Sequence, residues 1–154
     1  MIGRDPLPLV IRGSSGSGNP KSLCRRRRSS ANHDPASMAT IRDLVSTVRQ
    51  REGVTAAVVL GRDGLLIDGQ ATAGIDTDGL AAVVPAVLTA GDELGEHAGG
   101  GALATCVLEY EGRVIIVCSL TTDAILVVVA SEEADIGKLL FELRRNRRRI
   151  AAIM

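Results

Sequence analysis

The segment 124–130 reads AILVVVA and contains no polar side chain. Side chains along a strand point alternately to its two faces, so a strand made from this segment is apolar on both of them. Such a strand is expected at the centre of a sheet that is covered on both sides. A single layer of helices cannot cover both faces, so the second face needs another helix, a partner subunit, or both.

Four further segments have the β-branched and aliphatic composition of strands and are bounded by turn residues. They are residues 54–60, 65–68, 102–110 and 113–120. Residues 61–64 are expected to form the first hairpin turn, because Asp and Gly suit its backbone angles. Gly69 is expected to end the second strand. The dipeptide Glu111-Gly112 connects the third strand to the fourth.

The first helix is predicted over residues 39–52. Thr40 is placed to cap it, with Asp43 three residues later as the acidic partner of a capping box. Gly53 is expected to end it. Four apolar residues have the spacing that puts them on one face of this helix: Ile41, Leu44, Val45 and Val48.

The longest helix is predicted from near Asp76 or Thr77 to about His97. Its apolar stripe consists of Leu80, Val83, Val84, Val87, Leu88 and Leu94. Much of its remaining surface is small, because it is formed by Ala81, Ala82, Ala86 and Ala90. Such a helix can be approached closely by two neighbours. Pro85 removes a hydrogen bond from the helix interior, so we predict a kink there or a helix that starts later.

Five carboxylates are spread along this longest helix: Asp76, Asp78, Asp92, Glu93 and Glu96. They indicate a solvated face, or alternatively a surface that meets a basic patch on a partner.

A third helix is predicted to start at Ser131, a good N-cap, with carboxylates in its first turns. Its buried face is formed by Ile136, Leu139, Leu140 and Leu143. It ends in the run RRNRRR at 144–149. This run indicates a basic helix end, a contact with a partner protein, or a contact with nucleic acid or an anionic membrane. The basic helix end is favoured. The excess of acidic residues in the rest of the folded part and the scarcity of aromatic residues argue against nucleic acid as a partner.

The composition changes at Met38. Residues 1–37 carry GSSGSGNP and RRRR and lack a sustained hydrophobic period, so we expect a disordered basic tail or a start site placed too far upstream. Residues 38–154 are expected to form one folded domain. The first part has seven basic and two acidic residues, and the second has 11 basic and 16 acidic residues. The net charge of zero therefore hides a basic tail and an acidic domain.

The sequence contains no motif for catalysis or for binding a metal or cofactor, and none of these is expected. The glycines at 61, 64 and 99–101 lack the Lys-Ser/Thr pair that completes a phosphate-binding loop. His97 is best explained as a positive charge at a helix end. No apolar run approaches the roughly 20 residues that a membrane-spanning helix needs.

Three cysteines are too few and too scattered for a disulfide framework or a zinc site. They are expected to be small buried residues of a protein in a reducing cytoplasm. The position of Cys106 relative to Cys118 depends on the length of the turn between their strands. A two-residue turn at Glu111-Gly112 puts them on opposite faces, whereas a three-residue turn could bring them face to face.

The element order α-β-β-α-β-β-β-α over residues 38–154 resembles that of the roadblock (dynein light chain) family. Local sequence resembles the family too, at Gly53-Val54, Asp63-Gly64-Leu65, Thr77 to Gly95 and Glu109 to Arg113. The resemblance implies an α+β, profilin-like fold with a five-stranded antiparallel sheet, strand order 2-1-5-4-3, and helices on both faces.

The resemblance also implies a homodimer, formed by pairing the strands at 102–110 and packing the helices at 77–97. The interface residues implied are Leu80, Val83, Val84, Val87, Leu88, Ala102, Ala104, Cys106 and Leu108. Members similar to the bacterial protein MglB activate a small Ras-like GTPase by surface contact with its switch region. We therefore expect a non-enzymatic, cytoplasmic GTPase regulator, or alternatively a structural adaptor in a signalling or motility assembly.

Overall fold

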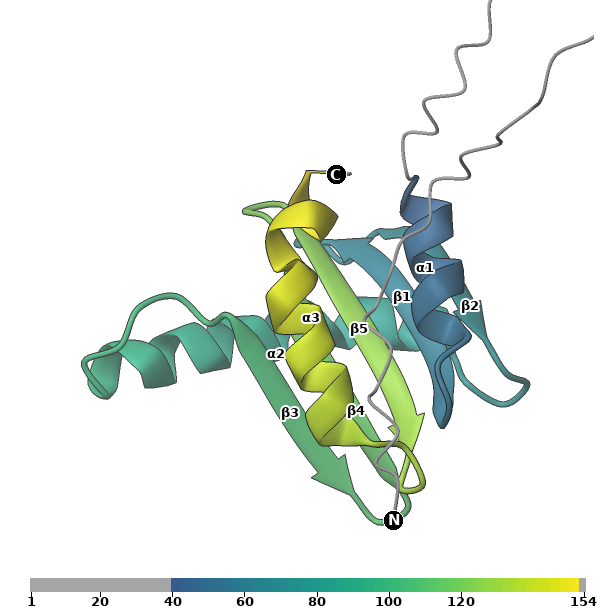
Figure 1. Cartoon of the computed structure of the whole chain (residues 1–154). Coiled ribbons are helices and arrows are strands. Elements are labelled where there is room, and N and C mark those ends of the chain that lie inside the picture. Colours follow the sequence, from purple (N-terminus) through teal and green to yellow (C-terminus); the bar gives the residue numbers. More distant parts are fainter. Residues whose placement is uncertain (1–39, 153–154) are drawn as a thin grey trace, which may run out of the picture.

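The computed structural model describes residues 40–152, so the predictions for residues 1–37 lie outside the described part of the chain (Figure 1). The elements follow one another in the predicted order. They are α1 (Ile41–Arg49), β1 (Val54–Gly61), β2 (Leu66–Ala71), α2 (Thr77–His97), β3 (Thr105–Tyr110), β4 (Arg113–Ser119), β5 (Ala124–Ser131) and α3 (Ile136–Ala151).

The five strands form one antiparallel sheet in the order β2-β1-β5-β4-β3, as predicted. β5 lies between β1 and β4, where Val127 pairs with Val58 on one side and with Val117 on the other. All residues of β5 from Ala124 to Ala130 are buried. The strand that is apolar on both faces is therefore central and covered on both sides.

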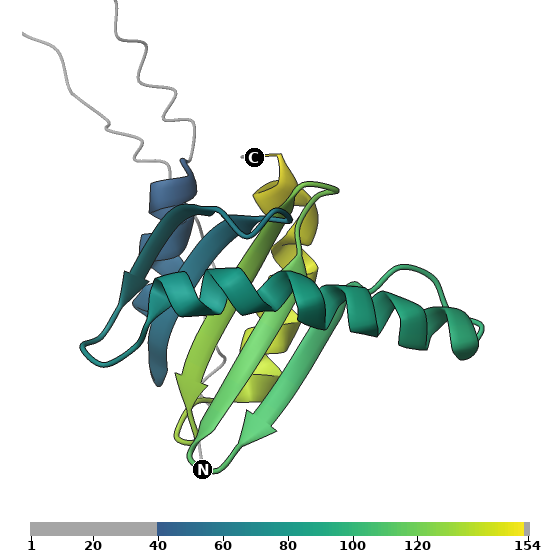
Figure 2. The same ribbon diagram turned by 180° about the vertical axis from the view of Figure 1, so that it is seen from behind.

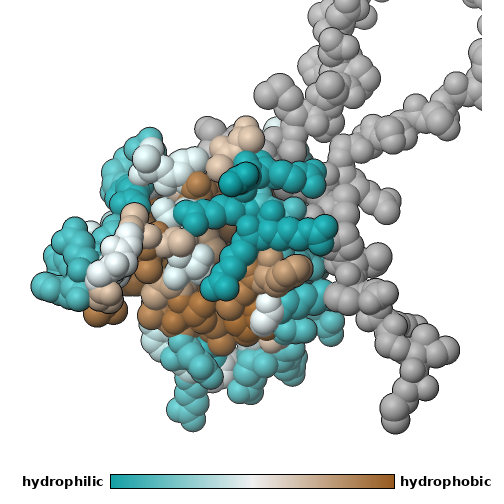
Figure 3. Space-filling view, turned by 60° about the vertical axis from the view of Figure 1, so that its left-hand side comes forward, coloured by the Kyte–Doolittle hydropathy of each residue, from teal (hydrophilic) through white to brown (hydrophobic). Residues whose placement is uncertain are grey.

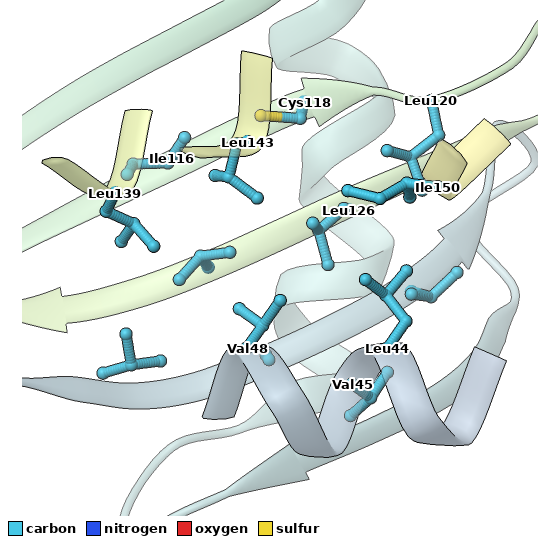
Figure 4. Packing of buried hydrophobic residues seen from close by; sticks show 14 of the residues in the cluster. Leu44, Val45, Val48, Ile116, Cys118, Leu120, Leu126, Leu139, Leu143 and Ile150 are labelled. Atoms are coloured by element: carbon cyan, nitrogen blue, oxygen red, sulfur yellow. The ribbon is translucent and has the colours of Figure 1, made fainter. Parts of the chain in front are cut away.

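Two separate cores lie on the two faces of the sheet. α1 and α3 cover one face, and α2 crosses the other (Figures 1 and 2). In the first core, Leu44 and Val48 of α1 and Leu143 of α3 pack toward Leu126 and Ile116 of the sheet (Figure 4). The second core is smaller and consists of Val58, Leu60, Ala81, Val84, Leu88, Val117, Ile125 and Val127.

The capping box predicted for α1 is present. The Thr40 hydroxyl oxygen accepts a hydrogen bond from the Asp43 backbone N–H at 3.2 Å, and the Asp43 carboxylate accepts one from the Thr40 N–H at 2.8 Å. The hydrogen bonds from Thr40 hold the pKa of Asp43 below its ordinary value. The helix itself is shorter than predicted, because it ends at Arg49 and residues 50–53 form a turn into β1.

Removal of this cap should be measurable as lost stability. Thr40→Ala is expected to lower the free energy of unfolding by about 1 kcal/mol at neutral pH, because the Asp43 N–H loses its acceptor. A carboxyl group whose pKa is lowered in the folded protein stabilises the fold at pH values above the ordinary pKa of that group. This contribution to stability is lost as the pH falls through the lowered pKa. Thr40→Ala keeps the backbone N–H that donates to the Asp43 carboxylate but removes the hydroxyl that also donates to it at 2.8 Å. Urea unfolding of both proteins across this pH range should therefore show a difference that becomes smaller in acid, and a constant difference would contradict it.

Three further predicted boundaries are wrong. β2 runs from Leu66 to Ala71, so Gly69 lies inside the strand, where it pairs with Val58 of β1. β3 begins at Thr105 instead of residue 102. Ser131 ends β5, and the N-cap of α3 is Asp135, whose carboxylate accepts a hydrogen bond from the Lys138 N–H at 2.9 Å. In each case pairing or packing with distant residues outweighs the local signal.

α2 begins at Thr77, capped by Asp76, and continues through Pro85 to His97 without a break (Figure 2). The alternative of a later start is therefore wrong, and the predicted kink does not interrupt the helix. The β1–β2 turn packs against the helix here, since a Cβ on Gly64 would lie 3.1 Å from the Ala81 carbonyl oxygen. Burial of the helix on the sheet offsets the hydrogen bond that proline removes.

The turn between β3 and β4 has two residues, because Tyr110 pairs directly with Arg113. Cys106 and Cys118 therefore lie on opposite faces of the sheet, and both thiols are free. Cys118 belongs to the core under α1 and α3, whereas Cys106 packs against the core under α2.

Candidate functional site

A groove of about 430 Å³ lies between the N-terminal half of α2 and the uncovered part of the sheet beside it. Its helix side is formed by Leu80, Val83 and Val87, and its sheet side by Leu108, Tyr110 and Ile115. Val83 is 61% exposed and Tyr110 is 55% exposed. The lining is mostly apolar and open to solvent, which is the character of a surface that binds another protein.

The β3–β4 register brings the sheet side of the groove together. Leu108 pairs with Ile115, and Tyr110 pairs with Arg113, so these side chains share the face that α2 crosses. Asp76 lies at the N-terminus of α2 and is the one acidic residue among the lining residues, as Arg113 is the one basic residue. The groove is therefore better suited to apolar side chains than to a charged ligand.

β3 lies at the end of the sheet next to this groove. It pairs with β4 on one side, and no strand of residues 40–152 pairs with its other side. An edge strand of this kind offers backbone N–H and C=O groups to another chain. The exposed edge and the apolar groove thus form one continuous candidate surface.

α2 extends past β3 and projects from the sheet (Figures 1 and 2). In the projecting half Leu94 is 70% exposed, and Ala86 and Ala90 on the helix are exposed as well. Leu103 packs against α2 at Gly91, where the projecting part of the helix begins. The contact is close, because a Cβ on Gly91 would lie 2.5 Å from the Leu103 Cδ2 atom. Three of the four predicted small residues, Ala82, Ala86 and Ala90, are therefore accessible to a neighbour. The fourth, Ala81, is buried in the core under α2.

Asp92 fixes α2 to the rest of the domain. Its carboxylate accepts a hydrogen bond from the Leu103 N–H at 2.7 Å and lies 3.7 Å from the Arg62 guanidinium. Arg62 also donates to the Ser119 hydroxyl at 3.4 Å. Two of the five carboxylates on α2 thus have structural roles: Asp92 forms these contacts, and Asp76 is the N-cap. The other three are exposed: Asp78, Glu93 and Glu96.

The predicted interface residues have different positions. Leu80, Val83, Val84, Val87 and Leu108 line the groove. Val84 and Leu88 are buried against the sheet, at 4% and 2% exposure, because α2 needs them for its own packing. Cys106 packs beside that core, and Ala102 and Ala104 are exposed but precede β3.

Sequence reasoning missed two parts of the surface. Tyr110 and Ile115 line the groove, and alternation along their strands was the signal that could have placed them there. The second part is an apolar patch at the opposite end of the sheet, where Leu65, Leu66 and Ile67 are 67%, 41% and 49% exposed. It lies at the β1–β2 hairpin and is separate from the groove.

The described residues contain no group of three or more His, Cys, Asp or Glu side chains that could hold a metal ion. Burial raises the pKa of the Cys118 thiol, which keeps it protonated and a poor nucleophile. No helix within residues 40–152 has both the length and the apolar character to cross a bilayer.

Comparisons with known proteins agree on the fold. The family model of the Roadblock/LC7 domain matches residues 40–130. Two uncharacterized proteins of Methanocaldococcus jannaschii are each 26% identical over 107 residues, which is 69% of this chain and 92% of each relative.

Solved structures give the same picture. A Roadblock/LC7 domain from Streptomyces avermitilis superimposes with a TM-score of 0.66 and 25% identity, covering 73% of this chain and 96% of that one. The gliding protein MglB from Thermus thermophilus superimposes with a TM-score of 0.65 and 22% identity, covering 73% of this chain and 86% of that one.

Proposed function

Because this chain belongs to the Roadblock/LC7 domain family, we propose that it is a homodimer that regulates a small Ras-like GTPase by surface contact. The observation that carries the proposal is the continuous surface formed by the edge of β3 and the apolar groove beside α2. The similarity to MglB, a gliding protein, supports a GTPase as the partner, since MglB-like members of the family act on Ras-like GTPases.

In the proposed dimer, β3 of one protomer pairs with β3 of its partner, and the two α2 helices pack side by side. Exposed Ala86 and Ala90 permit close approach of the second helix. Val83, Val87 and Leu108 supply apolar contacts. Ala102 and Ala104 extend the pairing at the start of β3, and Val84 and Leu88 support the helix from below.

The proposed action on the GTPase needs no catalytic residue from this chain. The regulator binds the switch region and stabilises the arrangement in which the GTPase uses its own groups on the attacking water and the γ-phosphate. We place the contact on the outer surface of the paired α2 helices, where Asp78, Glu93 and Glu96 are exposed to a basic patch on the partner.

A charge on the groove should break the dimer. Val83→Glu is expected to weaken self-association by about a hundredfold or more, because an unpaired carboxylate would be buried in the interface. Val83 is 61% exposed in one protomer, so the fold should be retained. Sedimentation velocity at micromolar concentration measures the effect.

The matched control is Leu65→Glu, which adds the same charge at a side chain that is 67% exposed in the β1–β2 turn. It should leave the dimer intact. A monomeric wild type, or equal dissociation constants for the two variants, would contradict the proposed interface.

The regulatory step is tested with the small GTPase encoded nearest to this gene. GTP hydrolysis is measured with increasing amounts of wild type, Val83→Glu and Leu65→Glu. An acceleration that saturates at a fixed stoichiometry, and that Val83→Glu loses, is expected. Binding without acceleration would favour the alternative, a structural adaptor, for which the separate patch at Leu65 to Ile67 supplies a second attachment surface. Absence of binding would refute the GTPase as partner.

A further inference from the structure

The C-terminal half of α3 is strongly basic. Five of six consecutive residues are arginines, and all five are exposed: Arg144, Arg145, Arg147, Arg148 and Arg149. The described part of the chain has three ion pairs, and none of them involves these arginines. The proposed GTPase function does not use this surface, which lies on the face of the sheet opposite the groove.

The helix dipole accounts for only part of this cluster. Arg148 and Arg149 lie in the last turn, where a positive charge is favoured. Arg144, Arg145 and Arg147 lie further from the helix end. Like charges three and four positions apart repel one another on a helix surface. The cluster is therefore unfavourable for the isolated domain and favourable when an anionic surface neutralises it.

An apolar side chain stands on the same face of α3. Phe141 is 64% exposed, and it precedes Arg145 and Arg148 by four and seven positions, so the three side chains point in the same direction. The opposite face of the helix is buried on the sheet through Leu139, Leu143 and Ile150. The only phenylalanine of the chain thus projects outward beside the arginines.

Figure 3 shows long hydrophilic side chains lying next to a hydrophobic area on this side of the molecule. Val107 contributes exposed apolar surface here. It is 42% exposed and pairs with Ile116, whose side chain lies in the core under α3. Basic and apolar surface therefore adjoin, as they do on proteins that lie at a membrane interface.

We propose that the outer face of α3 binds the surface of an anionic lipid bilayer. In this arrangement the guanidinium groups of Arg144, Arg145 and Arg148 bind lipid phosphates, and Phe141 enters the boundary between headgroups and acyl chains. The association is peripheral, consistent with the absence of a membrane-spanning helix among residues 40–152.

Nucleic acid fits this face less well. Arginines can contact guanine, but adenine is read by side-chain amides. The one amide within the cluster, Asn146, is 7% exposed and donates to the Glu142 carbonyl oxygen at 2.9 Å, so it is not free to read a base. Base stacking uses several aromatic rings, whereas this face has only Phe141.

The test is co-sedimentation of the full chain with vesicles. Wild type should bind vesicles of equal parts phosphatidylcholine and phosphatidylglycerol, should not bind pure phosphatidylcholine, and should be released by salt. The triple variant Arg144→Gln, Arg145→Gln, Arg148→Gln should bind the anionic vesicles about a hundredfold more weakly. Phe141→Ala should bind about tenfold more weakly with its charge unchanged. These side chains are exposed, so the thermal unfolding of the variants should match that of wild type.

The matched control removes the same charge elsewhere in the chain, with Arg25→Gln, Arg26→Gln and Arg28→Gln. It should keep most of the vesicle binding. Equal losses in the two triple variants would overturn the proposal, since net charge alone would then explain binding. Failure of wild type to bind anionic vesicles would overturn the proposal as well. If wild type bound a DNA duplex or an acidic protein in the same buffer instead, the face would be assigned to that partner.

Discussion

Replacing Gly53 with alanine should lower the free energy of unfolding by about 3 kcal/mol, through a strained backbone and an overpacked contact. Gly53 has a φ of 76°, in the left-handed region that disfavours side chains. A Cβ there would lie 2.6 Å from the Cβ atom and 2.7 Å from the Cα atom of Ala134. The Cα atom belongs to the backbone that leads into α3, so the contact can relax only if the two segments separate.

Gly112 provides the control for this prediction. Its φ is also 76°, but a Cβ on it would have no neighbour within 4 Å. Gly112→Ala should therefore cost only the backbone strain, about 1 kcal/mol. Urea unfolding followed by circular dichroism measures both variants. Equal losses would mean that the contact with Ala134 has no energetic consequence.

Replacing Arg51 with methionine should also destabilise the fold by about 3 kcal/mol, because it leaves a buried carboxylate unpaired. Glu142 of α3 has a side chain that is only 7% exposed, and its Oε2 atom lies 3.1 Å from Nη2 of Arg51. The Arg51 side chain is 28% exposed, so it can reach water more easily when its partner is lost. Glu142→Gln should therefore be the milder of the two single substitutions.

The double variant Arg51→Met, Glu142→Leu separates the cost of an unpaired charge from the value of the pair. Apolar replacement of both partners of a buried ion pair is often close to neutral. The double variant should recover most of the stability that Arg51→Met loses in denaturant unfolding. If the two losses were simply additive, the ion pair would be irrelevant to the effect of Arg51→Met.

These two predictions concern one corner of the molecule. The Ser131 N–H donates to the Gly53 carbonyl oxygen at 2.8 Å, which joins the start of β1 to the end of β5. The Arg51–Glu142 pair then joins the end of α1 to α3. The corner lies on the face opposite α2. Substitutions there should change stability while leaving the proposed partner surface intact in the molecules that remain folded.

Much of the fold could be predicted from local sequence. The apolar segment at 124–130 placed β5 in the centre, because a strand without polar side chains must be covered on both faces. The spacing of Leu44, Val45 and Val48 located the buried face of α1, and Thr40 with Asp43 located its start. The order of the elements, and which of their residues are buried, depend on residues that are close together in the chain. These features can therefore be predicted from the sequence pattern.

The ends of several elements could not be predicted in this way. Gly69 is a poor strand residue by itself, yet it stays in β2 because its backbone pairs with β1. Ser131 is a good helix cap by itself, yet it continues β5 because its N–H bonds to Gly53. Hydrogen bonds to distant residues decide these positions, and their partners are not visible in the local sequence.

The candidate surface was likewise predictable only in part from the sequence. The sequence identified α2 as apolar on one side and small on another, but it could not separate Val84 and Leu88, which are buried, from Val83 and Leu94, which are exposed. Only the angle at which α2 crosses the sheet decides that its N-terminal half borders a groove and its C-terminal half projects (Figure 2). The chain thus determines which residues are apolar, and tertiary packing determines which of them remain available to a partner.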